Sequence, residues 1–475
     1  MTLPHPYFEK SSDAPVGRRR LLVISYRFPP DTTIGSRRWE KLAHFAVTRG
    51  WSLDILTRQP AVTEGDPARM SSLPAGLRVY GVPQPRLWLK RLEDWVWRIY
   101  RDVLPRARRR NDTAQGDDGA APAPTERPLS LDRRDIRWHP TRVRELLRLY
   151  WVLVEQAHYA AWARGAVKLG NQLVAAEEYA AVISSGPPHM SHEAGRSIAE
   201  RHDLPFVMDM RDLWSLSPRL HEHVASPMWF RIAERYERRA VTRASLIVAN
   251  NEPARRALMQ AYPAAADHII TVLNGADDYP LPATHHDACF RIRFAGTIYI
   301  TSDVATLLSA VRMVIDDLGL GPDELQVELV GPMDNPETAT IAALARARHV
   351  ENYVSVGPLL SHSAALDFLA GASMLVIFSG FGAVTLPAKT FEYVRFSAWI
   401  LAQGESGSAL DLMLQNTAAD VVPPSDATAT AAAIRRRIEQ YRAGVRPSPV
   451  VSDDRYSRAR QADILLDALD TVTHR

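Results

Sequence analysis

The sequence contains a single cysteine, Cys289, among 475 residues. One thiol excludes an internal disulfide framework, and this scarcity is typical of proteins in a reducing compartment. No apolar run approaches the roughly 20 residues needed to cross a bilayer. The N-terminus (MTLPHPYFEKSSDAPVGRRR) lacks the basic-then-apolar order of a secretory signal. We therefore expect a cytoplasmic protein, either in solution or peripheral at the inner face of the membrane.

A large excess of charge is also absent, since the formal net charge is +3. Hydrophobic residues make up 46% and charged residues 23%, the mix of a globular protein. The length exceeds what one core usually supports, so two domains are expected. Basic residues gather between 86 and 144, with RARRR at 106–110. Such a stretch indicates a solvated surface or a surface for anionic lipid or nucleic acid. An acidic, proline-rich insertion interrupts it, so we expect no nucleic-acid partner.

Short apolar runs alternate with longer amphipathic ones, the rhythm of βαβ units with mainly parallel sheets. This alternation predicts a doubly wound α/β fold that occurs twice. The expected strands are 21–25, 53–57, 77–83, 181–185, 205–210, 246–249, 270–273, 292–295, 326–330, 353–356, 374–378, 399–402 and 420–422. The expected helices include 36–48 and 191–202.

Breaks in this rhythm suggest how the chain is divided. The segment DDYPLPATHH (277–286) offers proline and charge without periodicity, as an interdomain linker does. We expect a tail at 1–19, a first domain at 20–279 and a second at 287–450, with the two domains facing each other across a cleft. An irregular stretch at 108–134 is predicted to be a disordered insertion. A C-terminal helix at 453–475 is expected to pack back on the first domain.

Open parallel sheets bind ligands at the carboxyl ends of their strands, so the loops there are the candidate sites. The first loop (25–39) leads directly into a helix, whose N-terminus exposes backbone N–H groups. Gly35 would let a ligand approach the backbone, and Arg37 and Arg38 add positive charge. This loop suits a phosphate or a sugar hydroxyl. The alternative is an ordinary connector with solvated arginines.

Two further loops of the first domain carry titratable side chains. In SSGPPHMSH (184–192), His189 and His192 are three residues apart, but no third metal ligand is evident, so we expect no metal site. His189 is a candidate hydrogen-bonding residue of the cleft. In MDMRDLW (208–214), the residues Asp209, Arg211 and Asp212 sit at the end of an apolar strand. They would position a hydroxyl or stabilise developing charge. The alternative is an internal salt bridge.

The region around the linker offers two more candidate loops. Asn274 lies in VLNGADD (272–278), which closes the first domain. Asn-Gly by itself is only a turn signal. Gly296 and Thr297 lie between the first strand of the second domain and a helix, where backbone N–H groups can face a diphosphate.

The second domain supplies the remaining candidates. Lys389 and Glu392 are one helical turn apart in PAKTFEY (387–393), and therefore both can face the same cleft. A lysine suits a diphosphate and a carboxylate suits the two hydroxyls of a ribose. The alternative is an exposed ion pair. Gly407 and Ser408 begin a helix after another strand, which favours an anion.

Taken together, these segments resemble GT-B glycosyltransferases of family four, in the branch with a family-four-like N-terminal domain. The resemblance spans roughly Leu21–Leu412. It is carried, in order, by FPPDTTIGSRRWEKLA, VISSGPPHMSHEAG, PFVMDMRDLWS, VLNGADD, RFAGTIY, VELVGP and LPAKTFEYV.

The resemblance implies two Rossmann-like domains, with a nucleotide-sugar donor in the second domain and an acceptor in the first. Lys389 would neutralise the diphosphate, Glu392 would hold the ribose and the 404–408 loop would donate backbone N–H groups. Gly35 would lie near the diphosphate or the acceptor. The family transfers the sugar with retention and usually needs neither a metal nor another cofactor. The acceptor would be a glycan, a glycolipid or a lipid-linked sugar of cell-surface polysaccharide or glycoconjugate biosynthesis.

Two departures from the family pattern leave other functions open. In the Glu-x7-Glu motif, Glu392 matches the second glutamate, but Val384 occupies the position of the first. Many relatives carry an arginine and a lysine in the loop after the first strand of the second domain, whereas GTIYITS (296–302) has neither. The alternatives are a non-catalytic nucleotide- or glycan-binding protein and a nucleotide-sugar epimerase of the same fold.

The segment 86–104 (RLWLKRLEDWVWRIYRDVL) has the pattern of an interfacial helix. One helical face would carry Trp88, Leu92, Trp95, Ile99 and Val103, and the others Lys90, Arg91, Arg98 and Arg101. This pattern predicts peripheral contact with an anionic membrane. The alternative is a helix packed on the first domain.

Overall fold

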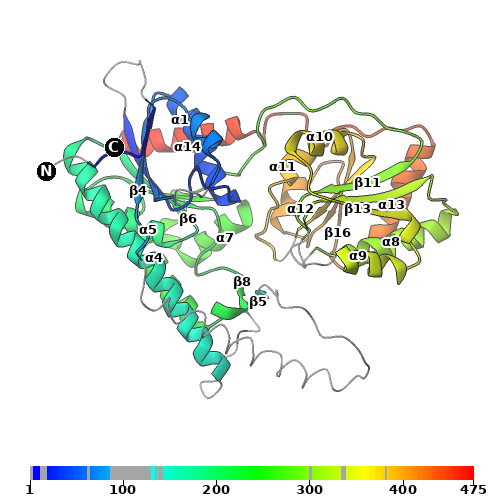
Figure 1. Cartoon of the computed structure of the whole chain (residues 1–475), viewed down its shortest axis with the longest axis horizontal. Helices are drawn as coiled ribbons and strands as arrows, with labels where there is room; N and C mark the ends of the chain where they lie inside the picture. The colour runs from blue at the N-terminus through cyan, green and yellow to red at the C-terminus, as the bar shows by residue number, and fades with distance from the viewer. Residues whose placement is uncertain are drawn as a thin grey trace. The chain divides into compact units, whose positions relative to one another are not determined.

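The structure is a computed structural model. It describes residues 4–10, 19–60, 65–85, 130–133, 136, 143–298, 302–332, 338–379 and 382–474. The chain forms two compact units (Figure 1). The first comprises Met1–Val272 together with Ala462–Arg475, and the second comprises Leu273–Gln461.

The first unit is built on a sheet with the strand order β1-β4-β3-β2-β6-β7-β9-β10. All neighbouring strands run parallel except β1, which pairs antiparallel with β4 at one edge. The strands are β1 (Phe8–Lys10), β2 (Arg20–Ser25), β3 (Ser52–Arg58), β4 (Leu77–Val82), β6 (Ala181–Gly186), β7 (Phe206–Met210), β9 (Leu246–Ala249) and β10 (Ile269–Thr271). A separate antiparallel ribbon pairs β5 (Ser130–Asp132) with β8 (Arg219–His221).

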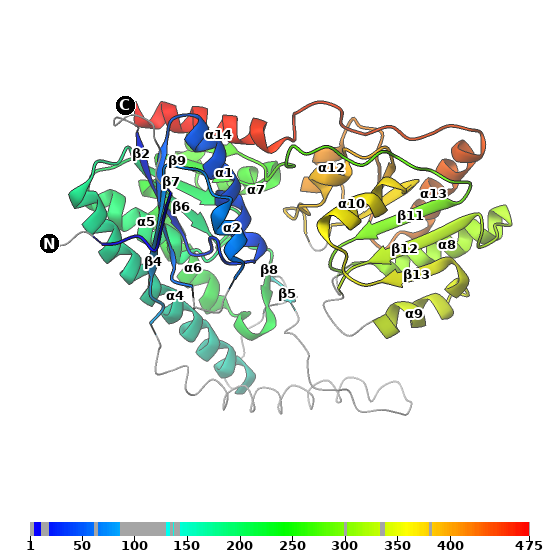
Figure 2. The same ribbon diagram turned by 45° about the horizontal axis from the view of Figure 1, so that its top comes forward.

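Helices cover both faces of this sheet (Figure 2). They are α1 (Arg37–Thr48), α2 (Pro67–Ser71), α4 (Val143–Ala176), α5 (Met190–Arg201), α6 (Pro227–Arg243), α7 (Glu252–Ala261) and α14 (Arg458–Thr473), with 3-10 turns η1 (Ile34–Ser36), η4 (Glu222–Val224) and η5 (Pro263–His268). On one face, Leu21 and Val23 of β2 share a core with Trp39 of α1 and with Leu465 and Leu469 of α14. Successive strand residues point to opposite faces, so the remaining apolar residues of β2 pack under the other helical layer.

The second unit is a parallel sheet with the order β13-β12-β11-β14-β15-β16. Its strands are β11 (Phe290–Ala295), β12 (Leu325–Val330), β13 (Val354–Gly357), β14 (Met374–Phe378), β15 (Trp399–Gln403) and β16 (Asp420–Val422). Its helices are α8 (Val304–Leu318), α9 (Thr338–Arg346), α10 (His362–Ala370), α11 (Thr390–Tyr393), α12 (Ala409–Leu414) and α13 (Ala427–Arg442), with the 3-10 turn η6 (Glu351–Tyr353).

The expected fold class is confirmed, because both units are α/β with parallel, doubly wound sheets. Each of the thirteen predicted strands is present, with ends shifted by at most two residues. The predicted helices at 36–48 and 191–202 are α1 and α5. The helix expected from 453 begins only at Arg458. Three strands had no counterpart in the prediction, β1 and the two strands of the β5–β8 ribbon, and the long helix α4 was not predicted either. The apolar residues of α4 are spread around the helix, so it shows no amphipathic stripe.

The boundary between the units falls after Val272, whereas the sequence placed it at 279. The reason is that Leu273, Tyr279 and Leu281 pack against an apolar core of the second unit. The segment 86–104, predicted to be interfacial, lies outside the described residues, as does most of the insertion predicted at 108–134. Among the helices that the structure describes, none has the length and apolar character to span a bilayer.

Candidate functional site

In each sheet, there is one pair of neighbouring strands from which the strand order runs outward in opposite directions, and we call this position the reversal point. In open α/β sheets, the loops that follow these two strands turn to opposite faces of the sheet, and ligands commonly bind between them. In the first unit, the reversal lies between β2 and β6. In the second unit it lies between β11 and β14. The loop after β2 contains Gly35, and the loop after β6 contains His189. The loop after β11 contains Gly296, and Lys389 follows β14. Each unit therefore places predicted site residues at its own reversal point.

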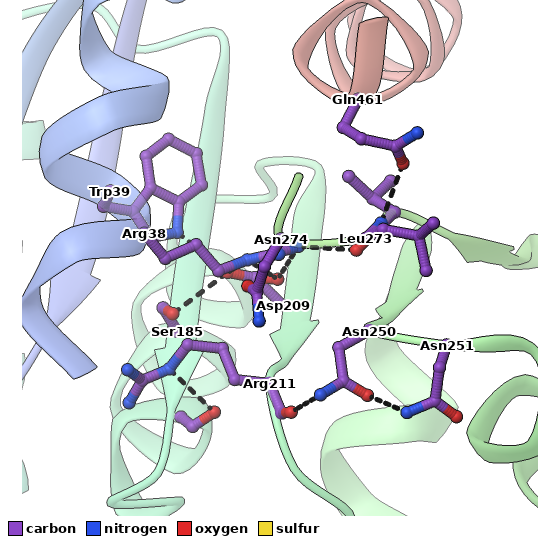
Figure 3. Close-up of polar contacts among 12 residues, drawn as sticks. Arg38, Trp39, Ser185, Asp209, Arg211, Asn250, Asn251, Leu273, Asn274 and Gln461 are labelled. Carbon is purple, nitrogen blue, oxygen red and sulfur yellow. Dashed lines mark hydrogen bonds and ion pairs between the residues drawn. The ribbon is translucent and has the colours of Figure 1, made fainter. Parts of the chain in front are cut away.

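A buried ion pair lies at the carboxyl end of β7 in the first unit (Figure 3). The Arg38 guanidinium contacts both carboxylate oxygens of Asp209, with Nε at 3.0 Å from each and Nη2 at 2.9 Å from Oδ1. Oδ2 also accepts hydrogen bonds from Trp39 Nε1 at 2.9 Å and from Ser185 Oγ at 3.0 Å. Arg38 Nη2 donates to the Val272 carbonyl at 3.2 Å. The cluster ties α1 to three strand ends.

The Asp209 carboxylate is fully enclosed, with 0% of its surface exposed. Burial alone would raise the pKa of Asp209. The charge of Arg38 and the hydrogen bonds outweigh burial and hold the pKa below its ordinary value. A buried carboxylate that already accepts four N–H or O–H donors has no position left for a substrate proton. This geometry is the internal salt bridge named above as the alternative, and it gives Asp209 a positioning role.

Arg211 joins two loops that flank the reversal point. Figure 3 shows its contact with Asn250. Its Nη1 donates to the Gly35 carbonyl, Nη2 to the Pro187 carbonyl and Nε to the Gly186 carbonyl, the last at 3.3 Å. Its own carbonyl accepts from the Asn250 side chain. A Cβ on Gly35 would lie 2.6 Å from Nη1, so glycine leaves room for the guanidinium. Burial lowers the pKa of Arg211.

One residue next in sequence to Arg38 and one next to Arg211 have exposed side chains. Arg37, in the first turn of α1, is exposed, while Arg38 beside it is 4% exposed. Asp212, next to Arg211, is also exposed. Of the predicted residues in these two loops, Arg37 and Asp212 are therefore the ones with exposed side chains. Arg38 and Asp209 hold the loops in place.

His189 and His192 lie at the start of α5, next to Gly186. His189 stacks on Trp214, with ring centroids 5.1 Å apart and planes 15° from parallel. His192 is 0% exposed, and its Nδ1 lies 2.8 Å from Ser184 Oγ. Burial and the neighbouring His192 lower the pKa of His189 well below its ordinary value. Burial lowers the pKa of His192 to about 3. Both rings are therefore neutral at physiological pH.

A neutral buried histidine makes stability depend on pH. Below pH 6.5 the unfolded chain binds a proton that folded His192 does not, so stability falls as pH drops from about 6.5 towards 3. The expected loss for this one group is about 1.4 kcal/mol per pH unit. Between pH 6.5 and 5, wild type should lose about 2 kcal/mol more than His192→Asn, measured by urea unfolding. The exposed His268→Asn is the control and should behave as wild type. Equal pH slopes for wild type and His192→Asn would contradict this prediction.

In the second unit, Lys389 reaches back to the end of β11. Its Nζ donates to the Ala295 carbonyl at 3.3 Å and lies 3.6 Å from the centre of the Phe294 ring. A Cβ on Gly296 would lie 2.8 Å from Nζ, and Gly296 has φ +127°, a region that favours glycine. Burial lowers the pKa of Lys389 to about 7. Lys389 is also the only lysine in the sequence from 273 to 461.

Glu392 lies one turn after Lys389, and its Oε1 accepts a hydrogen bond from the Tyr279 hydroxyl. Sequence reasoning missed Tyr279, because it lies in a segment that was interpreted as linker. Tyr393, next to Glu392, is 1% exposed and holds the end of β11. Its hydroxyl accepts from the Ala295 N–H at 2.8 Å and donates to the Ala295 carbonyl at 3.0 Å.

Two of the predicted N–H donors of the 404–408 loop, those of Gly407 and Ser408, are engaged within the protein. The Gly407 N–H donates to Asp411 Oδ2 at 2.8 Å, and the Ser408 N–H donates to the Glu405 carbonyl at 3.1 Å. The Ser408 hydroxyl caps α12 by accepting from the Asp411 N–H at 3.2 Å. A phosphate that bound to the Gly407 N–H would have to displace its contact with Asp411.

Similarity to known proteins was found in structure and not in sequence. No family model matches the sequence, and no curated protein matches it. The lipopolysaccharide outer core galactosyltransferase WaaB, in its apo form, aligns over 95% of this chain and 99% of its own, with 10% identity and TM-score 0.58. A glycosyltransferase from Rickettsia africae aligns over 96% and 98%, with 10% identity and TM-score 0.58. HepE from Anabaena, in complex with UDP and glucose, aligns over 95% and 100%, with 13% identity and TM-score 0.55.

The chain has the GT-B fold. At these identities the likeness shows the fold alone, and the assignment to family four stays a prediction. Within the GT-B fold, the structure groups the predicted residues by unit. In the first unit, the fold brings Gly35 and Arg38 close to Asp209, Arg211 and His189.

In the second unit of this GT-B chain, Gly296 and Lys389 meet, and Thr297 lies half-buried next to Gly296. The Asn274 carbonyl accepts a hydrogen bond from Arg458 Nη1 at 2.6 Å. Among the described residues, no group of three or more histidine, cysteine or acidic side chains is arranged to hold a metal ion.

Proposed function

We propose that this protein is a glycosyltransferase that moves a sugar from a nucleotide-sugar donor to a glycan, glycolipid or lipid-linked acceptor. The observation that carries the proposal is the placement of Lys389 beside Gly296 at the reversal point of the second sheet. A lysine beside a glycine that has no Cβ suits a diphosphate, which needs both a charge and close access to the backbone. The GT-B fold and the presence of UDP in the HepE structure support the same proposal.

The donor would bind to the second unit. Lys389 would contact the diphosphate, and Glu392 would accept hydrogen bonds from the ribose hydroxyls. Negative charge develops on the leaving nucleoside diphosphate as the bond to the sugar breaks. A cation fixed before the reaction stabilises that charge without reorganisation. In this way Lys389 would do work that a metal ion does in other enzymes, and transfer with retention is the expected stereochemical course.

The acceptor would bind to the first unit, at the loops joined by Arg211. The exposed side chains there, Arg37 and Asp212, together with His189, are the groups available to hold acceptor hydroxyls or phosphate. Arg38 and Asp209 would act through these loops as positioning residues. The neutral His189 is suited to hydrogen bonding with a sugar hydroxyl, because one ring nitrogen donates and the other accepts.

One observation favours a second candidate, a binding protein without turnover. Val384 stands where the family resemblance expects a glutamate near the sugar. An aliphatic side chain cannot accept a hydrogen bond from a hydroxyl. The test below therefore separates binding from turnover.

A donor screen tests the proposal. Purified protein is incubated with UDP-, GDP- and ADP-linked sugars, and binding is measured by calorimetry and slow hydrolysis by nucleotide release. We expect one donor to bind at a single saturable site. Without an acceptor, the protein should hydrolyse that donor slowly and release the nucleotide. Binding without release favours the non-catalytic protein, and conversion of the sugar without release favours an epimerase. If no donor binds, the proposed function is wrong.

A further inference from the structure

The Tyr279 hydroxyl donates a hydrogen bond to Oε1 of Glu392. Tyr279 comes from the segment that enters the second unit, 113 residues before Glu392 in the sequence. This contact joins the entry segment to α11, the short helix that carries the proposed ribose ligand. The sequence analysis named Tyr279 only as part of the linker segment 277–286. Its phenol can donate to a carboxylate while its ring packs on apolar neighbours.

The structure holds Tyr279 firmly on several sides. Arg395 Nη2 donates to its carbonyl at 2.7 Å, and the guanidinium lies 5.3 Å from the centre of its ring. Arg395 Nη1 also donates to the Asp277 carbonyl at 2.8 Å. The His362 ring meets the Tyr279 ring edge-on at 5.3 Å. Arg395 is one turn beyond Glu392, so the same stretch of chain carries the carboxylate and fixes the tyrosine that contacts it.

We propose that Tyr279 is a positioning residue for ribose recognition, whose hydroxyl holds the Glu392 carboxylate in the orientation that receives the ribose hydroxyls. The inference rests on the proposed function, in which Glu392 binds the ribose. A carboxylate has about four acceptor positions, so it can accept from a tyrosine and from both hydroxyls of a ribose at once. Tyr279 therefore does not have to leave when a nucleotide binds.

Positioning has a measurable consequence. Without the tyrosine hydroxyl, the glutamate carboxylate loses one of the contacts that orient it in the free protein, and the ligand must supply that ordering. Ordering one such side chain weakens binding by roughly five- to tenfold. The loss falls only on ligands that use the carboxylate. A ligand that lacks the ribose hydroxyls gains nothing from an oriented Glu392 and should be indifferent to Tyr279.

The test compares UDP, GDP and ADP with their 2′,3′-dideoxy analogues by calorimetry, on wild type and Tyr279→Phe. We expect Tyr279→Phe to bind the preferred ribonucleotide roughly five- to tenfold more weakly and its dideoxy analogue as wild type does. In a Glu392→Ala background, the further change Tyr279→Phe should have no effect. Tyr353→Phe is the matched control, since it removes one hydroxyl that donates to the Leu320 carbonyl at 2.8 Å elsewhere in this unit.

The other outcomes overturn the inference in distinguishable ways. Equal weakening of ribo- and dideoxynucleotide would mean that Tyr279 only stabilises the fold. Unchanged ribonucleotide binding to Tyr279→Phe would mean that the hydroxyl does not contribute to binding. Tighter binding would mean that the hydroxyl competes with the ribose for Glu392. In each of these cases the nucleotide still binds wild type, so the proposed function survives. If wild type binds none of the six nucleotides, the proposed function and this inference are both wrong.

Discussion

Replacing Asp209 by alanine is expected to lower the free energy of unfolding of the first unit by about 3–5 kcal/mol. The substitution leaves Arg38, which is 4% exposed, as a buried charge without its carboxylate. It also leaves the Trp39 and Ser185 donors without their acceptor. An ion pair gives little net stability when intact, but breaking one side of it is costly, because the remaining charge has lost its water and its partner.

Urea unfolding followed by tryptophan fluorescence measures this loss. Ten of the eleven tryptophans precede residue 272 in the sequence, so the signal reports mainly on the first unit. Glu234→Ala is the control. It breaks an exposed ion pair with Arg238 in α6 and should cost less than about 1 kcal/mol. A loss for Asp209→Ala as small as that of Glu234→Ala would mean that the buried cluster relaxes and does not hold the loops.

Replacing Lys389 by methionine is expected to weaken nucleotide-sugar binding by about 100-fold, since removing a buried partner of a charged ligand group costs about 2–5 kcal/mol. Methionine keeps a flexible apolar chain over the Phe294 ring but has no charge. Calorimetry with the donor found in the screen measures the change. The exposed Arg435→Met is the control, since it removes a positive charge from α13 of the same unit.

The same lysine makes binding depend on pH. With a pKa of about 7, Lys389 loses its proton as pH rises from 6 to 9 in the free protein. The diphosphate of a nucleotide sugar keeps its charge over this range, because both phosphates are esterified. Wild type should therefore bind more weakly as pH rises above 7, and Lys389→Met should show a flat profile. A flat wild-type profile, or a variant that binds as well as wild type, would show that the lysine does not contact the diphosphate.

The sequence predicted the fold well because both signals that specify it are local. Apolar runs of four to six residues give the strands, and the loops after them necessarily fall at one edge of each parallel sheet. This reasoning placed Gly296 and Lys389 at strand ends of the second domain, and the structure has both at the reversal point of its sheet. A further signal was available in the composition: arginine supplies every other fixed cationic side chain of that unit, so its single lysine stands out.

The partners of each side chain could not be predicted in the same way. Asp209 lies near the end of β7 and Asp212 just after it, and no local pattern indicates that the first is enclosed by donors while the second is exposed. Their difference depends on α1 and β6, which are distant in sequence and meet only in the fold. Tyr279 was missed for a related reason. Its segment has no periodicity, and its proposed role depends on a contact with Glu392, which is 113 residues away in the sequence.

The first unit is formed by two separate segments of the chain, and this affects how it folds during synthesis. The core of the first unit includes Leu465, Leu466 and Leu469, which are synthesised only after the whole of the second unit, Leu273–Gln461. At ordinary translation rates of about 5–20 residues per second, that stretch takes roughly 10 to 40 s to emerge. During this interval β2 and α1 are present on the nascent chain without the helix that covers them. The first unit therefore begins to leave the ribosome before the second unit, but its core is complete only after α14 has been synthesised.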